Sequence, residues 1–291
     1  MITLRPRYLC LHTLVVCVCL QFPVLASAQQ NEHGGVRKQA TAVRVADGAI
    51  RLDGRLDDEG WREAPPITDF VQKEPDEGVA PTQAMEVRIV YDSDAIYVGA
   101  RMHSQKGVPI QTPMGRRDDV EALAENLLVS FDTFHDRRTA YAFGVSANGV
   151  RIDRFYRADD ENSFDVGFDP VWQARTSMDQ DGWTAELWIP FSQLRFTNQP
   201  EQVWGVNVKR FIPTNNEADY WVAVPRTQRG WSSYFGDLQG IQGIRPPRRI
   251  EMLPYVAGAS TVEGNRDPGI RSTTIWPAAW EQTSRWASAR T

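Results

Sequence analysis

The chain has 291 residues, a formal net charge of −5 and only three cysteines. Cys10, Cys17 and Cys19 all lie near the N-terminus, so disulfides, thiolate zinc sites and a cysteine nucleophile are excluded from the rest of the chain. Arginines form isolated pairs rather than a basic patch, which together with the acidic balance argues against a nucleic-acid partner. The residues beyond the N-terminus are enough for one large core or two small ones.

The first residues have the pattern of a cleaved signal peptide. Arg5 and Arg7 precede an apolar run from residue 9 to residue 25, and Ala26-Ser27-Ala28 supplies the small residues that a signal peptidase needs. A membrane anchor is the alternative, but the run is at the lower limit of a span and contains Pro23. We therefore predict export, with cleavage before Gln29, to the periplasm, the outer membrane or the medium.

A polar, glycine-bearing segment, residues 29–42, follows and is interpreted as a flexible lead-in. Beyond it the sequence has the two-residue period of β-strands. Met85–Tyr91 and Ala95–Met102 alternate apolar and polar residues on either side of Asp92-Ser93-Asp94, which predicts a hairpin with one buried face.

Further short strands are predicted at regular spacing, and Asn148-Gly149 is a strong hairpin turn. Short helices are expected at Asp57–Trp61 and Arg117–Ala124, and a helical turn after Pro190. This pattern is typical of an all-β protein, an antiparallel immunoglobulin-like or jelly-roll β-sandwich with one or two short helices. The remaining predicted strands are Leu127–Phe134, Thr139–Val145, Val150–Tyr156, Trp172–Met178, Trp183–Ile189, Trp204–Ile212 and Tyr220–Val224.

Composition changes again towards the C-terminus. Glycine and proline mark residues 242–249 as a linker, and Ile250–Ala259 looks like a new strand. From Ile270 onward, Trp276, Trp280 and Trp286 follow no strand or helix period. We expect residues 250–291 to be the truncated start of a second β domain with an aberrant, disordered tail, produced by natural truncation or by a frameshift.

Five segments, in order, resemble the family 9 carbohydrate-binding modules. Together they span residues 43–241, so the resemblance implies that this range is one carbohydrate-binding-like β-sandwich. The segments are Ile50–Trp61, Val87–Val98, Gly182–Pro190, Trp204–Val208 and Trp231–Leu238.

The resemblance also implies a binding site in which two tryptophan rings clamp a terminal sugar. A carboxylate and Arg, Asn and Lys side chains then bond the sugar hydroxyls, a combination of stacking and polar contacts suited to pyranoses. Trp231 matches the second clamp tryptophan. The first falls near Ala122 or Leu123, the carboxylate near Leu128, and the Arg and Asn near Gly144 and Ser146.

Other tryptophans and aspartates are candidates for ligand contact. Trp172, Trp188 and Trp221 lie at more open strand positions and are predicted to line a ligand surface, whereas Trp61, Trp183 and Trp204 are expected in the core. Two aspartate-rich turns offer oxygens to Ca²⁺, although such turns usually form without an ion. These calcium candidates are Asp92, Asp94, Asp179 and Asp181, and no other cofactor is implied.

A larger exported family is a closer resemblance, carried by Asp132–Tyr141 and Arg248–Tyr255. In that family the module precedes a β-rich domain that is thought to be barrel-like and associated with the outer membrane. This resemblance implies an outer-membrane association through the second domain.

Three functions remain open from the sequence. The first is a non-catalytic module that binds a polysaccharide or a cell-envelope glycan, associated with hydrolysis of O-glycosyl compounds and polysaccharide catabolism. The second is a structural, periplasmic module without a sugar site. The third is a glycoside hydrolase by association; a catalytic pair of carboxylates is needed, but the acidic residues carry no catalytic motif and are interpreted as solvated loops. These acidic residues are Asp118, Asp119, Glu121, Glu125, Asp159, Asp160 and Glu161.

Overall fold

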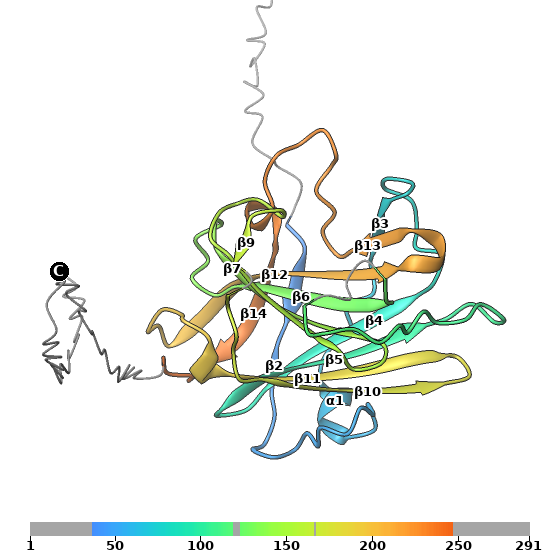
Figure 1. The fold of residues 1–291 in the computed structure, drawn as a ribbon. Coiled ribbons are helices and arrows are strands. Elements are labelled where there is room, and N and C mark those ends of the chain that lie inside the picture. The colour runs from blue at the N-terminus through green and yellow to red at the C-terminus, as the bar shows by residue number, and fades with distance from the viewer. Residues whose placement is uncertain (1–36, 119–122, 166, 247–291) are drawn as a thin grey trace, which may run out of the picture. The chain divides into compact units, whose positions relative to one another are not determined.

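A computed structural model describes residues 37–118, 123–165 and 167–246. These residues form two β-sheets that pack face to face around a shared apolar core (Figure 1). The predicted all-β sandwich is confirmed. The predicted signal peptide, the end of the linker and the second domain lie outside the described residues.

The smaller sheet has five strands in the order β10-β11-β5-β4-β2. All its pairings are antiparallel except that of β2 with β4. The strands are β2 (Val43–Arg44), β4 (Met85–Tyr91), β5 (Ala95–His103), β10 (Gln173–Asp179) and β11 (Gly182–Pro190).

In the described part of the chain, the larger sheet has nine strands, seven of them in the order β1-β14-β12-β6-β7-β8-β9. β13 pairs with β12 and also with β3, so these two strands extend the sheet beside β12. The strands are β1 (Gln39–Thr41), β3 (Val71–Glu74), β6 (Asn126–Asp132), β7 (Ala140–Ser146), β8 (Arg151–Tyr156), β9 (Phe164–Asp165), β12 (Glu201–Ile212), β13 (Glu217–Tyr220) and β14 (Gly236–Gln242).

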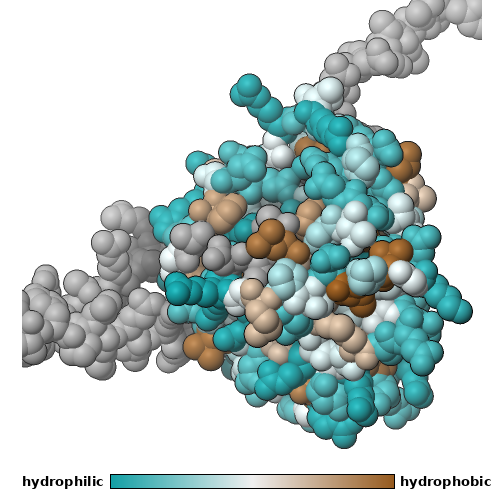
Figure 2. All heavy atoms as spheres, turned by 45° about the vertical axis from the view of Figure 1, so that its right-hand side comes forward, coloured by the Kyte–Doolittle hydropathy of each residue, from teal (hydrophilic) through white to brown (hydrophobic). Residues whose placement is uncertain are grey.

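Three apolar clusters stabilise the sandwich. The first lies between the sheets and contains Trp183 and Trp204, which are fully buried, so their predicted core positions are confirmed. The second contains outward-facing residues of the larger sheet, and the third contains Trp61 with residues of β4 and β5. Figure 2 shows a mostly hydrophilic face on which apolar side chains form small separate groups, as is usual for a protein surface.

A buried carboxylate joins two of the segments that carry the family resemblance. Glu186 of β11 accepts hydrogen bonds from Trp61 Nε1 at 2.9 Å and from the backbone N–H groups of Asp53 at 2.9 Å and Gly54 at 2.7 Å. Gly54 has φ +88°, and a Cβ there would lie 2.9 Å from the backbone of Thr176. These motif residues therefore fix the segment before α1 (Glu59–Glu63) against the smaller sheet.

Several predicted boundaries differ from the structure. The sandwich begins inside the expected lead-in, because β1 pairs with β14, and β14 itself runs to Gln242 at the start of the expected linker. The predicted strand Tyr220–Val224 is wrong beyond its first residue, since the chain leaves β13 after Tyr220 and forms a loop.

The predicted helical elements have mixed outcomes. The short 3-10 helix η1 (Phe191–Gln193) follows Pro190, as expected. The described ends of the expected helix Arg117–Ala124 are turns and bends, and residues 119–122 lie outside the described residues. Within the described part of the chain, no helix is long and apolar enough to cross a membrane.

Candidate functional site

A cleft of about 570 Å³ opens beside the end of β3. Its walls come from Lys73 on β3, from the loop between β8 and β9, and from the loop that follows β13. The lining is mostly polar or charged: Lys73, Asp159, Asp160, Glu161, Asn162, Val224, Pro225, Arg226, Gln228, Arg229 and Gly230.

One wall is a three-residue polar cluster that joins the loop between β8 and β9 to strands β3 and β13. Lys73 Nζ lies 2.7 Å from Glu161 Oε2, and the Tyr220 hydroxyl donates to Glu161 Oε1 at 2.6 Å. The Lys73 ammonium also lies 5.2 Å from the centroid of the Tyr220 ring. Because Lys73 and Glu161 keep only about a fifth of their side-chain surface exposed, their charges have a defined position at the cleft.

Asp159, on the same loop as Glu161, joins this loop to the segment that begins at Trp231. Its Oδ1 accepts hydrogen bonds from Trp231 N at 2.6 Å, Ser233 N at 2.9 Å and Ser232 Oγ at 3.3 Å. Burial alone would raise the pKa of Asp159, but the hydrogen bonds from Ser233, Trp231 and Ser232 outweigh it and lower that pKa. Asp159 is therefore an anion that caps the short 3-10 helix η3 (Ser232–Tyr234).

The loop that follows β13 is tied across the cleft to β3. Arg226 Nη2 donates to the carbonyls of Lys73 at 2.9 Å and Pro75 at 2.8 Å, and its backbone N–H points to the Glu77 carboxylate. Gly230 ends this segment with φ +115°, where a Cβ would lie 2.7 Å from Ser233 Oγ. Arg226 therefore anchors this loop to β3, and the positive φ at its other end favours glycine at position 230.

Trp231 lies beneath this loop rather than in open solvent. Its ring packs against Phe235 at 5.1 Å, Tyr220 at 5.8 Å and Tyr156 at 6.0 Å between centroids, and only 1 % of the residue is exposed. Trp231 therefore presents no open ring face in this structure, and its role in sugar binding stays a prediction. Val224 belongs both to this aromatic cluster and to the cleft lining, so the cluster supports the cleft from below.

The other tryptophan candidates are not brought together with the cleft. Trp172 and Trp221 are buried, and their indole N–H groups donate to Asp153 at 3.2 Å and Asp69 at 2.7 Å, so the expectation that both lie at open positions is wrong. Trp188 stays partly exposed, but it lies on β11 of the smaller sheet beside the third apolar cluster.

Two of the positions that the resemblance assigns to hydroxyl-binding residues, Leu128 and Gly144, lie side by side in the larger sheet and pack against apolar side chains. Leu128 of β6 lies directly opposite Gly144 of β7, which in turn lies opposite Ile152 of β8. A Cβ on Gly144 would lie 2.7 Å from Leu128 Cδ1, and Leu128 and Ile152 belong to the same cluster as Trp231. Leu128 and Gly144 therefore supply no carboxylate or guanidinium, whereas the third position, Ser146, is a buried polar residue that donates to Asn148 Oδ1.

The four calcium candidates act as turn residues in the structure. Asp92 Oδ1 accepts the backbone N–H of Asp94 at 2.9 Å, and Asp179 Oδ1 accepts that of Asp181 at 2.9 Å. Arg101 pairs with both Asp179 oxygens and lowers the pKa of Asp179 to about 2. In the part of the chain that the structure describes, no group of three or more His, Cys, Asp or Glu residues is placed to hold a metal ion.

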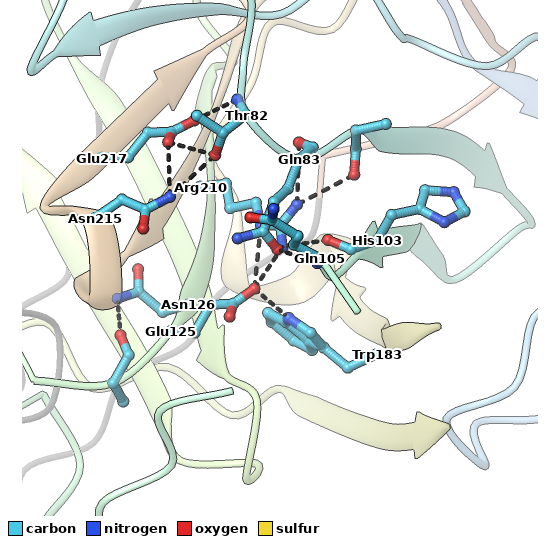
Figure 3. Close-up of polar contacts among 12 residues, drawn as sticks. Thr82, Gln83, His103, Gln105, Glu125, Asn126, Trp183, Arg210, Asn215 and Glu217 are labelled. Atoms are coloured by element: carbon cyan, nitrogen blue, oxygen red, sulfur yellow. Dashed lines mark hydrogen bonds and ion pairs between the residues drawn. The ribbon is translucent and has the colours of Figure 1, made fainter. Parts of the chain in front are cut away.

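Glu125 is not a solvated loop residue, as its sequence context suggested. It is 3 % exposed and pairs with the fully buried Arg210 of β12, with Oε1 2.6 Å from Arg210 Nη2 (Figure 3). Trp183 Nε1 donates to the same oxygen at 2.7 Å. Arg210 follows Val206 and Val208 at the inward-facing positions of a predicted strand, and this alternation is the signal that could have revealed a buried cation needing a partner.

Comparison with known proteins identifies the fold. No family model matches the chain, and no curated protein sequence matches it. Among solved structures, a family 9 carbohydrate-binding module of Caldicellulosiruptor kristjanssonii in complex with cellotriose has a TM-score of 0.51 and 14 % identity, covering 75 % of this chain and all of that module.

Two further structures agree. The complex of a family 9 module from the same organism with glucose gives a TM-score of 0.52 at 14 % identity over 72 % of this chain. A provisionally named carbohydrate-binding protein of Bacteroides uniformis gives 0.53 at 11 % identity over 71 % of this chain, and both structures are covered completely. The chain therefore has a fold like that of the family 9 carbohydrate-binding modules, as its five motifs predicted.

Proposed function

We propose that the chain is a non-catalytic carbohydrate-binding module that holds a saccharide at the cleft beside β3, in the service of polysaccharide breakdown. The observation that carries the proposal is the position of this cleft. Its lining ends at Gly230, directly before Trp231, the residue that matches the family's second clamp tryptophan. The likeness to modules solved with cellotriose and glucose supports the same class of ligand.

The chemistry of the cleft suits sugar hydroxyls, which both donate and accept hydrogen bonds. Asp159 offers a carboxylate oxygen, Asn162 an amide, and Arg229 an exposed guanidinium, while Lys73 and Glu161 form a fixed polar wall. Because the Trp231 ring is covered, we expect recognition by hydrogen bonds rather than by stacking, and hence weaker binding than a two-tryptophan clamp provides.

The test is binding of the full-length mature chain to a broad glycan array, followed by calorimetry with any glycan retained. Glu161→Gln removes the charge that holds Lys73 and Tyr220, so it should weaken binding about tenfold or more, the loss expected for one charged hydrogen-bonding group. Glu201→Gln, on the exposed start of β12, is the matched control and should bind as the parent does. Retention of no glycan at all would reject the proposal.

A second candidate is a structural module of a cell-envelope protein with no sugar site. It is favoured by Leu128 and Gly144, which stand at positions where the resemblance implies a carboxylate and an arginine. This candidate predicts no retention on the array, together with recovery of the protein in the outer-membrane fraction. Recovery of the full-length protein as a freely soluble species would contradict it.

Export is part of both candidates. We propose cleavage between Ala28 and Gln29, on the pattern of basic, apolar and small residues at the N-terminus. N-terminal sequencing of the protein purified from a cell-envelope or periplasmic fraction should begin at Gln29. An intact N-terminus in the cytoplasmic fraction would contradict export.

A further inference from the structure

Two buried polar side chains that face each other have unused hydrogen-bond acceptors. Asp219 of β13 and Gln72 of β3 are directly paired across the strands, and they are 1 % and 4 % exposed. Among the residues that the structure describes, neither oxygen of Asp219 has a hydrogen-bond donor, and Gln72 Oε1 has none. The Gln72 amide cannot be turned to donate instead, because its Nε2 already donates to the Ala80 carbonyl at 2.9 Å.

Glu217 lies two residues before Asp219 on the same strand and has the opposite environment. Its carboxylate accepts hydrogen bonds from Thr82 N at 2.7 Å, Thr82 Oγ1 at 2.6 Å and Asn215 Nδ2 at 3.3 Å (Figure 3). Three donors stabilise a negative charge on Glu217, whereas none stabilises one on Asp219. When two neighbouring buried carboxyls differ in this way, a proton resides on the one without donors.

The nearby cation does not change this assignment. Arg210 of β12 is the cross-strand partner of Asp219, but its guanidinium is committed to Glu125 and to the carbonyls of Ala84 and His103. The charged groups around Asp219 are therefore Glu217 on its own strand, Arg210 on β12 and Glu125 at the start of β6, while β3 presents the neutral Gln72. If Asp219 were ionised as well, this buried cluster would hold three carboxylates, and in the described part of the chain the guanidinium of Arg210 would be the one cation facing them.

We propose that Asp219 carries a proton at neutral pH, that this proton ties β13 to β3, and that its loss at alkaline pH loosens the wall of the cleft. The protonated carboxyl has one O–H to donate, and the acceptor that lacks a donor on the neighbouring strand is Gln72 Oε1. That bond joins β13 to β3 and gives this acceptor its donor. Burial and the negative charge of Glu217 raise the pKa of Asp219 to about 8, in agreement with this geometry.

The connection to the cleft follows from strand alternation. Lys73 and Tyr220 are the residues that follow Gln72 and Asp219, so their side chains point to the opposite face, where they form the Lys73–Glu161–Tyr220 wall. When Asp219 loses its proton, its negative charge repels that of Glu217, at the point where β13 pairs with β3. This part of the inference, the regulation of ligand binding by pH, rests on the proposed function of the cleft.

The first test measures the proton directly in the full-length mature chain labelled with ¹³C. The carboxyl carbon of Asp219 should titrate with a midpoint near pH 8, while exposed aspartates titrate in the ordinary acid range. Asp219→Asn confirms the assignment of the signal, and sequential assignment replaces it if that variant does not fold. A midpoint below about pH 5 would overturn the proposal, as would a midpoint that shifts when Ca²⁺ is added or chelated.

The second test measures the attachment of β3. The measured quantity is the ratio of the amide exchange rate of residues 71–74 to that of the β4–β5 hairpin, because this ratio removes the effect of base catalysis. In the parent, the ratio should rise several-fold between pH 7 and about pH 9.5. The same ratio should stay constant in Asp219→Asn, and it should rise as in the parent in Asp160→Asn, which changes an aspartate of the cleft loop instead. A constant ratio in the parent would overturn the loosening.

The ligand experiment separates the two proposals. If a glycan binds, its affinity should fall several-fold between pH 7 and about pH 9.5 in the parent and hold in Asp219→Asn. If the titration and the exchange behave as expected but no glycan binds at any pH, the proton site stands and the proposed function fails. If a glycan binds with the same pH dependence in both proteins, the regulation of the cleft is refuted while the proposed function stands.

Discussion

Replacement of Glu186 tests the claim that the family-like motifs hold the sandwich together. Glu186→Ala leaves three donors without an acceptor, namely Trp61 Nε1 and the N–H groups of Asp53 and Gly54. Each unsatisfied buried group costs about 1–3 kcal/mol, so we expect a loss of about 3–5 kcal/mol in the free energy of unfolding, allowing for partial hydration of the site. A domain of this size has roughly 5–15 kcal/mol in total, so the variant should be folded but marginal.

Urea unfolding of the mature chain, followed by tryptophan fluorescence, gives the free energy and the m-value. Glu186→Gln keeps the shape and one acceptor oxygen but turns an amide N–H₂ towards a donor, so about 1–3 kcal/mol should be lost. The exposed Glu201→Ala should change stability by less than about 0.5 kcal/mol. A loss below about 1 kcal/mol for Glu186→Ala would refute the reasoning, because it would mean that water replaces the carboxylate at no cost.

Three further substitutions test backbone, surface and buried charge. Gly54→Ala should lower stability by about 2 kcal/mol or more in thermal unfolding, because φ is +88° and the new Cβ meets the Thr176 backbone at 2.9 Å. Gly48→Ala is the control: φ is +74°, but the new Cβ enters open space, so the cost should be only about 1 kcal/mol. Asp179→Asn breaks the exposed ion pair with Arg101 and should lower the free energy of unfolding by less than about 1 kcal/mol at neutral pH. Since the pKa of Asp179 is lowered to about 2, the greater stability of the parent should vanish as pH falls from about 4 to about 2. The pKa of Asp219 is raised to about 8, so its stabilising contribution is lost as pH rises. In urea unfolding, the difference in free energy of unfolding between Asp219→Asn and the parent should move in favour of the variant by up to about 1.4 kcal/mol per pH unit from about pH 5 to about pH 8, and a difference that does not change with pH would contradict this.

The parts of the fold that the sequence predicts well are those where one face of a strand is buried. Met85–Tyr91 was predicted with the bounds that β4 has, because alternation of apolar and polar residues continues to the aspartate turn. The turn at Asn148-Gly149 was equally predictable, since Gly149 has φ +86°. Both signals are local, so neither depends on what packs against the strand.

The errors concern residues whose partners are distant in the sequence. Trp172 and Trp221 looked open at the strand ends, yet Asp153 and Asp69 bind their indole N–H groups and let both rings be buried. Glu125 looked solvated because its partner Arg210 lies 85 residues further along the chain. Burial of polar groups is decided by such pairs, and local periodicity does not contain them.

The candidate site was predicted least well, for a related reason. The cleft takes its residues from β3, from the loop before β9 and from the loop after β13, and none of these segments carries a motif of its own. Asp159 and Glu161 were noted only as acidic loop residues. Their roles depend on Trp231 and Ser233 in one case and on Lys73 and Tyr220 in the other, which the tertiary structure brings to them.

Trp231 gives the sharpest distinction between a cleft and a clamp. Trp231→Ala removes a fully buried ring and should cost about 3–5 kcal/mol, so a loss of glycan binding in that variant would report unfolding as readily as a missing platform. Trp231→Phe keeps an aromatic ring against Tyr156, Tyr220 and Phe235, and it removes an indole N–H that has no hydrogen-bond partner in the structure. If the saccharide is held in the cleft, Trp231→Phe should bind as the parent does while Glu161→Gln binds weakly. If the loop from Pro225 to Gly230 opens so that the sugar stacks on the indole, Trp231→Phe should bind the glycan weakly, because a smaller ring loses stacking area. Glu161→Gln should then bind as the parent does, because Glu161 no longer faces the ligand.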